Sequence, residues 1–241
     1  MIHIKNKKLS EYGKKGALIR WNNFNKKIID NLKIKNKPCH LLLKARLCGF
    51  LAGDGTVKMR RENKNITRIN YEVNFFPDHI SLVKPYLQAL EELYCKKPSI
   101  KMDGKLYRIR TKCKIAYLDL SKISKFGLHT WEVPFNFLKN DKLKIEWLRA
   151  FFDSEGYVGN KEIRIQSVNE KGLHQVKQLL EELGIELKMY KYERKNKNWN
   201  TNYILSIMKK DHRKMYLNKI GFNHEIKLLK LKQLFSEATV A

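Results

Sequence analysis

The sequence predicts an α+β protein made of two similar αββαββα repeats. Residues 47–55 (LCGFLAGDG) and 148–156 (LRAFFDSEG) are both apolar stretches that end in an acid followed by glycine. Three further pairs of similar segments follow in the same order: Gln88–Leu93 with Gln178–Leu183, Tyr107–Arg110 with Tyr203–Ser206, and Lys125–Gly127 with Lys219–Gly221. Self-similarity that recurs in order along a chain indicates a duplicated domain, with small changes in loop length between the copies.

The elements of the first repeat, expected at 38–128, follow from local patterns. An apolar helix over about 38–53 ends at the first acid-glycine pair, and a strand pair follows it. Residues 68–75 alternate polar and apolar side chains, the period-two pattern of a half-buried strand. Pro77 and Asp78 precede a helix over about 79–94 whose leucines share one face. The elements expected after it are a hairpin that turns at 102–105 and a helix over about 114–126.

The second repeat, expected at 141–241, shows the same order of patterns. A helix over about 141–154 ends at the second acid-glycine pair. The elements expected after it are strands near 157–167, a helix at 170–183, strands near 186–193 and 202–208, and helices at 210–220 and 224–237. Residues 129–140 form the expected linker, in which Pro134 prevents a continuous helix. Residues 1–37 form a basic N-terminal extension, which is either a phosphate-binding arm or a basic tail.

The charge of the chain indicates an anionic partner. Its 241 residues contain 50 Lys+Arg against 24 Asp+Glu, a formal net charge of +26. Hydrophobic residues make up 43%, which excludes a disordered polycation and places the charge on a folded body. Nucleic acid is the first candidate, because neutralising phosphates releases counterions. A membrane surface is the second, although no apolar run is long enough to span a bilayer.

The cysteines and the N-terminus favour an intracellular protein. None of the four cysteines forms a C-x-x-C pair, and their spacings match no zinc module. We therefore expect reduced thiols, as in the cytoplasm or an organellar matrix. The first sixteen residues lack the apolar core of a secretory signal.

Two helices that end in acid-glycine predict a metal site. Small residues in both stretches, Gly49 and Gly53 in one and Ala150 and Ser154 in the other, would let the helices pack closely. That packing brings Asp54 and Glu155 together at one end. Two carboxylates at close range repel each other and need a cation. Oxygen ligands suit a divalent ion, most naturally Mg²⁺.

The two nine-residue stretches resemble the signature motifs of the LAGLIDADG homing endonucleases, in the single-chain form with two motifs. The segment Ile220–Lys227 is similar to the family's closing G-F-x-H-x-x-K pattern, and the resemblance covers about 38–235. It implies a monomer in which two antiparallel sheets form a saddle, with the motif helices at the central interface. It also implies a site-specific nuclease that makes a double-strand break in a long, nearly unique DNA target. The expected products carry short 3′ overhangs, and the expected cofactor is Mg²⁺, for which Mn²⁺ can substitute.

The resemblance also assigns roles to individual residues. Asp54 and Glu155 are the expected catalytic metal ligands, completed by the backbone carbonyls of Gly53 and Ser154. The earlier motif acid is structural in the family; it is Asp153 in the second repeat and is replaced by Ala52 in the first.

Auxiliary basic residues follow the family pattern only in part. Lys227 is the expected catalytic lysine, and the matching stretch of the first repeat has none. Asp78 and Asn169 stand where the family often has Gln or Lys after the second strand.

The polar face of the expected strands is free to meet DNA, because the opposite face is apolar. Arg, Asn and Gln side chains can bind base edges in the major groove. The candidate DNA-binding residues are Arg68, Asn70, Asn74, Arg108, Arg110, Arg164, Gln166 and Lys188.

Two other functions stay open at this point. A protein on the same fold could bind intron RNA as a maturase, or bind DNA without cleaving it. The retention of both motif acids favours the nuclease, since a pure binder could lose either one.

Overall fold

The computed structural model describes residues 38–61, 69–193 and 200–236, together with Gly13, Lys15, Gly16 and Ile19. The elements of the first repeat are α2 (Pro38–Ala52), β1 (Gly55–Arg61), β2 (Ile69–Phe75), α3 (Ile80–Tyr94), β3 (Ile100–Asp103), β4 (Leu106–Lys112) and α4 (Lys114–Ile123). Those of the second are α5 (Asp141–Glu155), β5 (Tyr157–Val158), β6 (Ile163–Ser167), α6 (Glu170–Glu182), β7 (Lys188–Tyr192), β8 (Asn202–Ile207), α7 (Lys210–Lys219) and α8 (Glu225–Ser236). Most of the basic extension lies outside the described residues, and so does Arg68.

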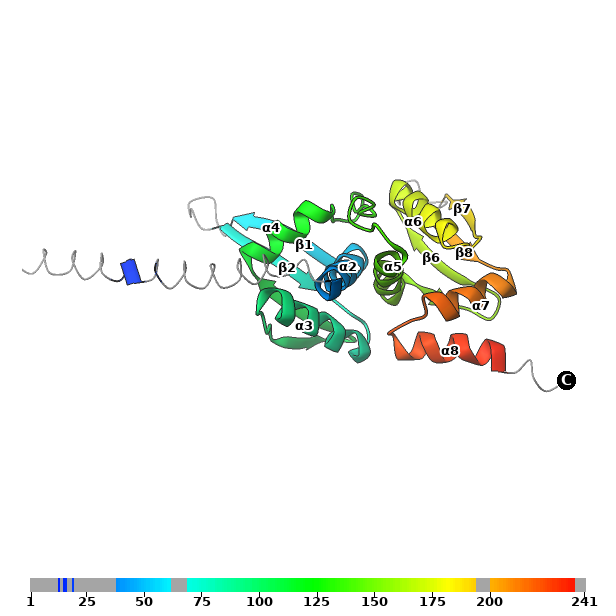
Figure 1. The fold of residues 1–241 in the computed structure, drawn as a ribbon, viewed down its shortest axis with the longest axis horizontal. Coiled ribbons are helices and arrows are strands. Elements are labelled where there is room, and N and C mark those ends of the chain that lie inside the picture. The colour runs from blue at the N-terminus through cyan, green and yellow to red at the C-terminus, as the bar shows by residue number, and fades with distance from the viewer. Residues whose placement is uncertain are drawn as a thin grey trace, which may run out of the picture.

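The two sheets have the same strand order, which confirms the predicted duplication. One sheet runs β1-β2-β4-β3 and the other β5-β6-β8-β7, and all neighbouring strands are antiparallel. Figure 1 shows one sheet on each side of the central helix pair, so the α+β prediction with two pseudo-symmetric repeats is confirmed. The exact division at residues 128 and 141 stays a prediction.

The motif helices α2 and α5 pack side by side at the centre of the molecule (Figure 1). A Cβ added to Gly49 of α2 would lie 2.4 Å from the backbone oxygen of Trp147 and 2.8 Å from Cβ of Ala150. These distances are shorter than any real Cβ contact, so the small residues do allow the close approach that the sequence predicted.

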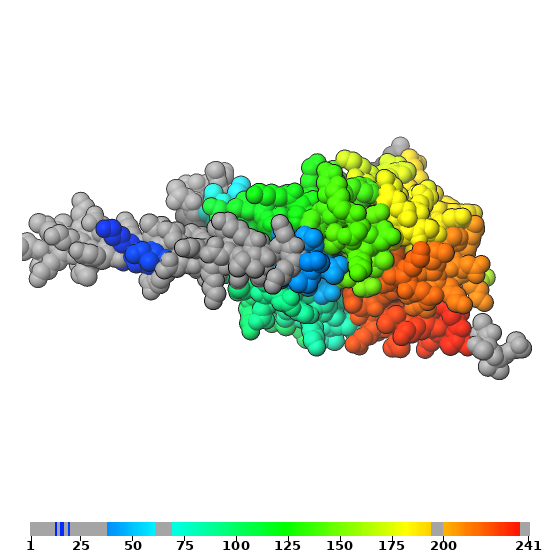
Figure 2. Space-filling model, viewed as in Figure 1, coloured from blue at the N-terminus to red at the C-terminus, as the bar shows by residue number. Residues whose placement is uncertain are grey.

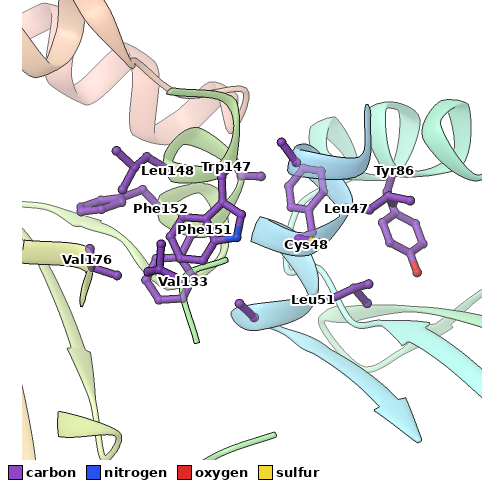
Figure 3. Packing of buried hydrophobic residues seen from close by; sticks show 14 of the residues in the cluster. Leu47, Cys48, Leu51, Tyr86, Val133, Trp147, Leu148, Phe151, Phe152 and Val176 are labelled. Carbon is purple, nitrogen blue, oxygen red and sulfur yellow. The ribbon is translucent and has the colours of Figure 1, made fainter. Parts of the chain in front are cut away.

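Each motif helix also contributes to the core of its own repeat (Figure 3). Phe50 of α2 packs against Phe75 and Tyr86, with ring centroids 4.8 and 6.3 Å away. In the second repeat, Phe152 of α5 packs against Tyr216 at 5.1 Å. These aromatic contacts join α2 to β2 and α3, and α5 to α7, within each repeat.

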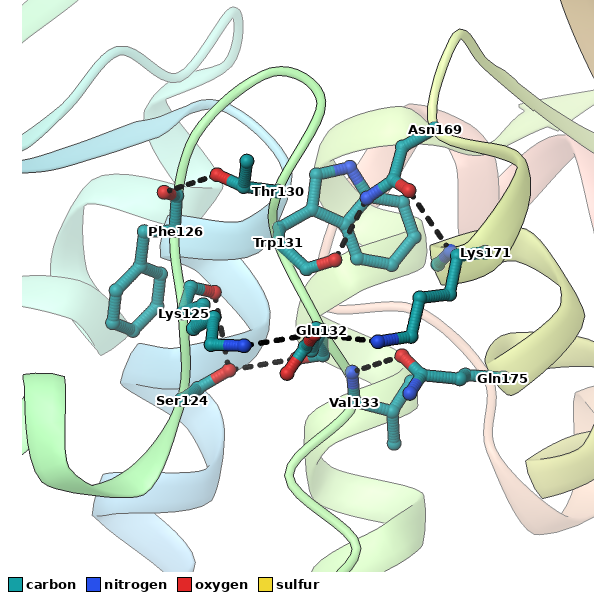
Figure 4. Close-up of polar contacts among 11 residues, drawn as sticks. Ser124, Lys125, Phe126, Thr130, Trp131, Glu132, Val133, Asn169, Lys171 and Gln175 are labelled. Atoms are coloured by element: carbon teal, nitrogen blue, oxygen red, sulfur yellow. Dashed lines mark hydrogen bonds and ion pairs between the residues drawn. The ribbon is translucent and has the colours of Figure 1, made fainter.

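Hydrogen bonds and an ion pair hold the linker against the second repeat (Figure 4). Asn169 Nδ2 donates to the backbone oxygen of Trp131 at 2.7 Å, and the backbone N–H of Val133 donates to Gln175 Oε1 at 2.9 Å. The carboxylate of Glu132 binds both Lys125 and Lys171. α4 ends at Ile123 rather than at the expected residue 126, because the chain turns there to join this linker network through Ser124.

The final helix, α8, begins at the boundary between the repeats. Figure 2 shows the orange and red residues of the chain's end beside the teal residues of the first repeat. The backbone N–H of Glu225, the first residue of α8, donates to Ser81 Oγ of α3 at 3.3 Å. Within the described part of the chain, no helix is long and apolar enough to cross a membrane.

Candidate active site

The C-terminal ends of the two motif helices meet at their acid-glycine pairs. α2 ends at Ala52, and Gly53 lies so near α5 that an added Cβ would be 2.6 Å from Cβ of Ser154 and 3.3 Å from Cγ of Glu155. Asp54 follows directly, and its negative charge is one cause of the raised pKa of Glu155. The structure therefore brings the two predicted acids to one place.

The glycines after the acids are required by close packing rather than by an unusual backbone angle. Neither Gly55 nor Gly156 has a positive φ. A Cβ on Gly55 would lie 2.4 Å from Cα of Leu51, and a Cβ on Gly156 would lie 2.4 Å from the backbone oxygen of Phe152. In each repeat the strand thus leaves the helix through a space that only glycine fits.

Both carboxylates are held in a setting that disfavours their charge. Burial, reinforced by the charge of Asp78, raises the pKa of Asp54 to about 6 against the opposing effect of Lys227. Burial and the charge of Asp54 raise the pKa of Glu155 to about 7, again against Lys227. Two half-buried acids that repel each other form a site at which a cation would be stabilised.

Lys227 reaches this site from α8. Its Nζ donates to the backbone oxygens of Asp153 at 2.5 Å and Ser154 at 3.1 Å, and lies 3.5 Å from that of Phe152. These are the last carbonyl groups of α5, the negative end of the helix dipole. Burial lowers the pKa of Lys227, while the charges of four nearby carboxylates, those of Asp78, Asp153, Asp54 and Glu155, oppose that decrease.

The earlier motif acid of the second repeat, Asp153, is a structural residue. Its carboxylate accepts hydrogen bonds from the backbone N–H groups of Asn223 and His224 and from the side-chain amide of Asn223, at 2.8 to 2.9 Å. It therefore binds the segment that leads into α8. Burial raises the pKa of Asp153 to about 6, against the effect of these hydrogen bonds. Ala52, its counterpart in the first repeat, is a buried apolar residue of α2.

Two residues at the family's auxiliary position have different surroundings. Asn169 is buried and caps α6, accepting the backbone N–H of Gly172 at 3.0 Å, so it is committed to the fold. Asp78 instead lies at the candidate active site, where its Oδ1 is 3.4 Å from Nε2 of His224. The hydrogen bond with His224 is the main cause that lowers the pKa of Asp78. Sequence reasoning missed this pair, because the partners come from different repeats.

The polar face of the first sheet carries most of the predicted DNA-binding residues. Arg108 and Arg110 are exposed on β4, and Arg108 pairs with Asp103 of β3. Asn70 and Asn74 of β2 are buried. Asn74 is 3% exposed, and its amide bonds to Glu72, to Thr56 and to the backbone N–H of Thr111.

The second sheet presents a matching face. Cross-strand pairing sets Arg164 of β6 beside Ser206 of β8, which in turn pairs with Lys188 of β7. Gln166 lies two residues along the same strand, so it shares the face of Arg164. The guanidinium of Arg164 stacks over the ring of Tyr157 at 4.7 Å and pairs with Glu162 at 3.2 Å.

A cavity of about 370 Å³ lies where the helix ends and the two sheets meet. Its lining includes Gly53 and Glu155 from the helix ends, Thr56 of β1, Gln166 of β6 and the linker residue Trp131. Both sheets therefore open onto the space beside the acid pair.

The donors at this site suit a hard divalent cation. Asp54 and Glu155 offer carboxylate oxygens, and the carbonyl of Ser154 already faces one positive group, the ammonium of Lys227. Among the described residues, no group of three or more His, Cys, Asp or Glu side chains is arranged to hold a metal ion, so the ligand set typical of zinc is not found there. Two carboxylates with backbone carbonyls do match magnesium chemistry.

Comparison with known families identifies the second repeat. A family model described as a LAGLIDADG-like domain matches residues 142–221, which include all but the first residue of α5 and the sheet β5–β8. This region of the chain is a LAGLIDADG-like domain. Both halves share the strand order of this matched region, so the LAGLIDADG fold occurs twice in the chain.

Two curated relatives of this chain come from Methanocaldococcus jannaschii. Glutamine–fructose-6-phosphate aminotransferase is 31% identical over 105 residues, which are 43% of this chain and 10% of that protein. An uncharacterized protein is 27% identical over 216 residues, covering 78% of this chain and 73% of that one. The chain thus spans only about a tenth of the first relative.

Among solved structures, the homing endonuclease I-DmoI has the same fold as this chain. Its complex with DNA and Mn aligns with a TM-score of 0.58 and 22% identity, covering 75% of this chain and 97% of I-DmoI. This likeness confirms the predicted two-repeat architecture.

Proposed function

We propose that this protein is a site-specific DNA endonuclease that cuts both strands of a long target and leaves short 3′ overhangs. The observation that carries the proposal is the meeting of Asp54 and Glu155, one from each repeat, at the ends of paired helices. Each repeat supplies one acid, so a pseudo-symmetric duplex can present one strand to each. I-DmoI, which has the same fold, is a homing endonuclease that has been solved with its target DNA.

In this proposal Asp54, Glu155 and the carbonyls of Gly53 and Ser154 hold the metal. A divalent cation bound there would supply positive charge to the scissile phosphate and lower the pKa of an attacking water. Mg²⁺ is the expected ion, with Mn²⁺ able to substitute; structures of I-DmoI with DNA have been solved with Mn, Mg and Ca. Lys227 supplies a second positive charge beside the two acids.

The two sheets supply binding to double-stranded DNA. Arg108 and Arg110 on one sheet, and Arg164, Gln166 and Lys188 on the other, lie on the faces that do not pack on helices. Arg and Gln side chains can form hydrogen bonds with base edges in the major groove. Buried Asn74 fits a different role, since its amide joins β1, β2 and β4 and keeps that face in shape. Asn70 is also mostly buried, and Arg68 stays a prediction outside the described residues.

A cleavage selection would test this function. The purified protein is incubated with a library of random duplexes in Mg²⁺, and the cut ends are sequenced. We expect one preferred target, cut on both strands with a 3′ overhang. Asp54→Asn and Glu155→Gln should each lower the rate at least ~1,000-fold while the protein still binds the target, since each removes a charge that the metal needs.

Binding assays with duplex DNA and folded RNA, run beside the selection, separate the alternatives. Tight binding to duplex DNA with no cleavage in Mg²⁺ or Mn²⁺ would favour a DNA-binding protein on the same fold. Preferential binding of folded RNA over duplex would favour an intron maturase. Full cleavage by both acid variants would overturn the assignment of the metal ligands.

A further inference from the structure

The first turn of α8 carries Lys227 and makes polar and stacking contacts with both repeats. From the second repeat, Asp153 accepts the backbone N–H groups of Asn223 and His224. Lys227 lies three residues after His224, and its ammonium reaches back to the end of α5. The position of this ammonium therefore depends on how that one helical turn is held.

The first repeat holds the same turn from the other side. His79 and His224 stack with ring centroids 4.7 Å apart and planes at 25°. Ser81 Oγ accepts the backbone N–H of Glu225 at 3.3 Å. Asp78 Oδ1 lies 3.4 Å from Nε2 of His224. Asp78, His79 and Ser81 all belong to the entry into α3, so α8 is attached across the boundary between the repeats.

His224 connects these contacts. Its side chain is buried, with 4% of the residue exposed. Its Nδ1 accepts the backbone N–H of Lys227 at 3.5 Å, so in the neutral ring the proton is on Nε2, which faces Asp78. One imidazole thus caps the turn that carries the lysine and anchors it to the first repeat.

We propose that Asp78 and His224 are positioning residues that hold the first turn of α8 against the first repeat and so keep Lys227 at the end of α5. The inference rests on the proposed function, because the lysine that they position serves that active site. It is consistent with an acid at Asp78, where the resemblance leads one to expect Gln or Lys. A carboxylate there accepts from His224, which a lysine side chain cannot do.

The first test measures the position of Lys227 without measuring cleavage. The full-length protein, free of DNA and metal, is methylated with formaldehyde and a borohydride, and modification of Lys227 is followed by mass spectrometry. Asp78→Ala and His224→Asn should speed modification of Lys227 roughly fivefold, because the turn opens more often. Asp78→Asn and His224→Gln should stay slow, since the first keeps an acceptor and the second keeps a donor near the place of Nε2.

The matched control is Asp211→Ala, which removes an exposed acid from the first turn of α7. It should leave modification of Lys227 unchanged. If Asp78→Ala, folded by circular dichroism, modifies Lys227 at the wild-type rate, the proposal is overturned. Asp78 is half exposed, so this variant carries the test even if His224→Asn fails to fold.

The second test asks whether the effect passes through Lys227. At saturating DNA, Asp78→Ala should lower kcat roughly tenfold and leave KM nearly unchanged, because the lysine is displaced and the DNA-binding sheets are not. In a Lys227→Met background, Asp78→Ala should cause no further loss of kcat. Equal losses in both backgrounds would show that Asp78 acts independently of Lys227 and would overturn the proposal. If the wild-type protein does not cleave at all, the proposed function fails, whereas the methylation result still decides the positioning role.

Discussion

Arg46 of α2 and Glu146 of α5 form an ion pair across the boundary between the repeats, with Nε 2.5 Å from Oε1. The second carboxylate oxygen of Glu146 accepts from Arg149, whose Nε donates to the backbone oxygen of Ile220 at 2.6 Å. The repeat alignment places Ala45 opposite Glu146 in sequence, so the other repeat has no copy of this acid. The pair is therefore an asymmetric contact in a pseudo-symmetric interface.

Loss of Glu146 should destabilise the protein strongly. Glu146→Ala leaves Arg46 and Arg149 without their shared carboxylate at a mostly buried interface, which should cost about 3 kcal/mol of unfolding free energy. Urea denaturation measures the loss. The control is Glu181→Ala, which removes an exposed partner of Lys177 and should cost less than about 0.5 kcal/mol. Similar losses in the two variants would contradict the role assigned to the pair.

A methyl group added at the helix interface should separate α2 from α5. In Gly49→Ala the new Cβ meets backbone at 2.4 Å, and we expect a net loss of about 2 kcal/mol after the gain in helix propensity. The melting temperature and the cleavage rate should fall together. The control is Gly16→Ala, whose new Cβ would meet no atom of the described residues within 4 Å beyond its own neighbours in the chain. A Gly49→Ala protein as stable as the wild type would rule out the close packing.

The acid pair predicts that the effect of metal on stability depends on pH. In the folded protein the pKa values of Asp54 and Glu155 are about 6 and about 7, against ordinary values of 3.8 and 4.5. The native state therefore keeps protons that the unfolded chain has lost between about pH 4 and pH 7, and ionisation of the pair lowers stability as the pH rises through that window.

A bound cation should relieve this loss only where the acids are ionised. Mg²⁺ should raise the melting temperature by roughly 3 °C at about pH 8 and by much less at about pH 5. Thermal unfolding with and without Mg²⁺ at both pH values measures the difference. In the Asp54→Asn, Glu155→Gln double variant the Mg²⁺ effect should disappear. An equal effect of Mg²⁺ at both pH values would place the binding site elsewhere.

The exposed sheet arginines should account for DNA affinity. Arg110→Ala should weaken binding by about 1–3 kcal/mol if Arg110 contacts a base, and should relax the choice of base at one position. If Arg110 contacts phosphate instead, the slope of the logarithm of the DNA-binding constant against the logarithm of salt concentration should decrease in magnitude by about one. The preference for particular bases should then stay unchanged. Lys230→Ala, on the exposed side of α8, is the control. Wild-type affinity and salt dependence in Arg110→Ala would remove β4 from the interface.

Local patterns predicted the fold well, because side-chain alternation and apolar runs determine where strands and helices form. The helix ends at Ala52 and Glu155 and the strand β2 lie within about a residue of expectation. The strands expected near 157–167 are β5 and β6. Residues 159–162 form a turn, with the N–H of Gly159 donating to the oxygen of Glu162, and leave β5 two residues long.

The contacts between repeats could not be predicted in the same way. The pairs Arg46–Glu146 and Asp78–His224 depend on how one repeat sits against the other, which no local period encodes. Asn74 illustrates a second difficulty. Its place on the polar face of β2 is as expected, but its amide is used by hydrogen bonds within the sheet. Alternation predicts a face of the sheet and does not predict whether a side chain on that face is free.

The attachment of α8 to α3 has a consequence for recombination between family members. The contact residues Asp78, His79 and Ser81 belong to the first repeat, whereas His224, Glu225 and Lys227 belong to the C-terminal segment. A chimera that exchanges the first repeat as a cassette therefore also replaces the docking surface of α8. Such hybrids should keep a correctly placed lysine only when the entry into α3 is transferred together with the start of α8, so the exchangeable unit is discontinuous in sequence.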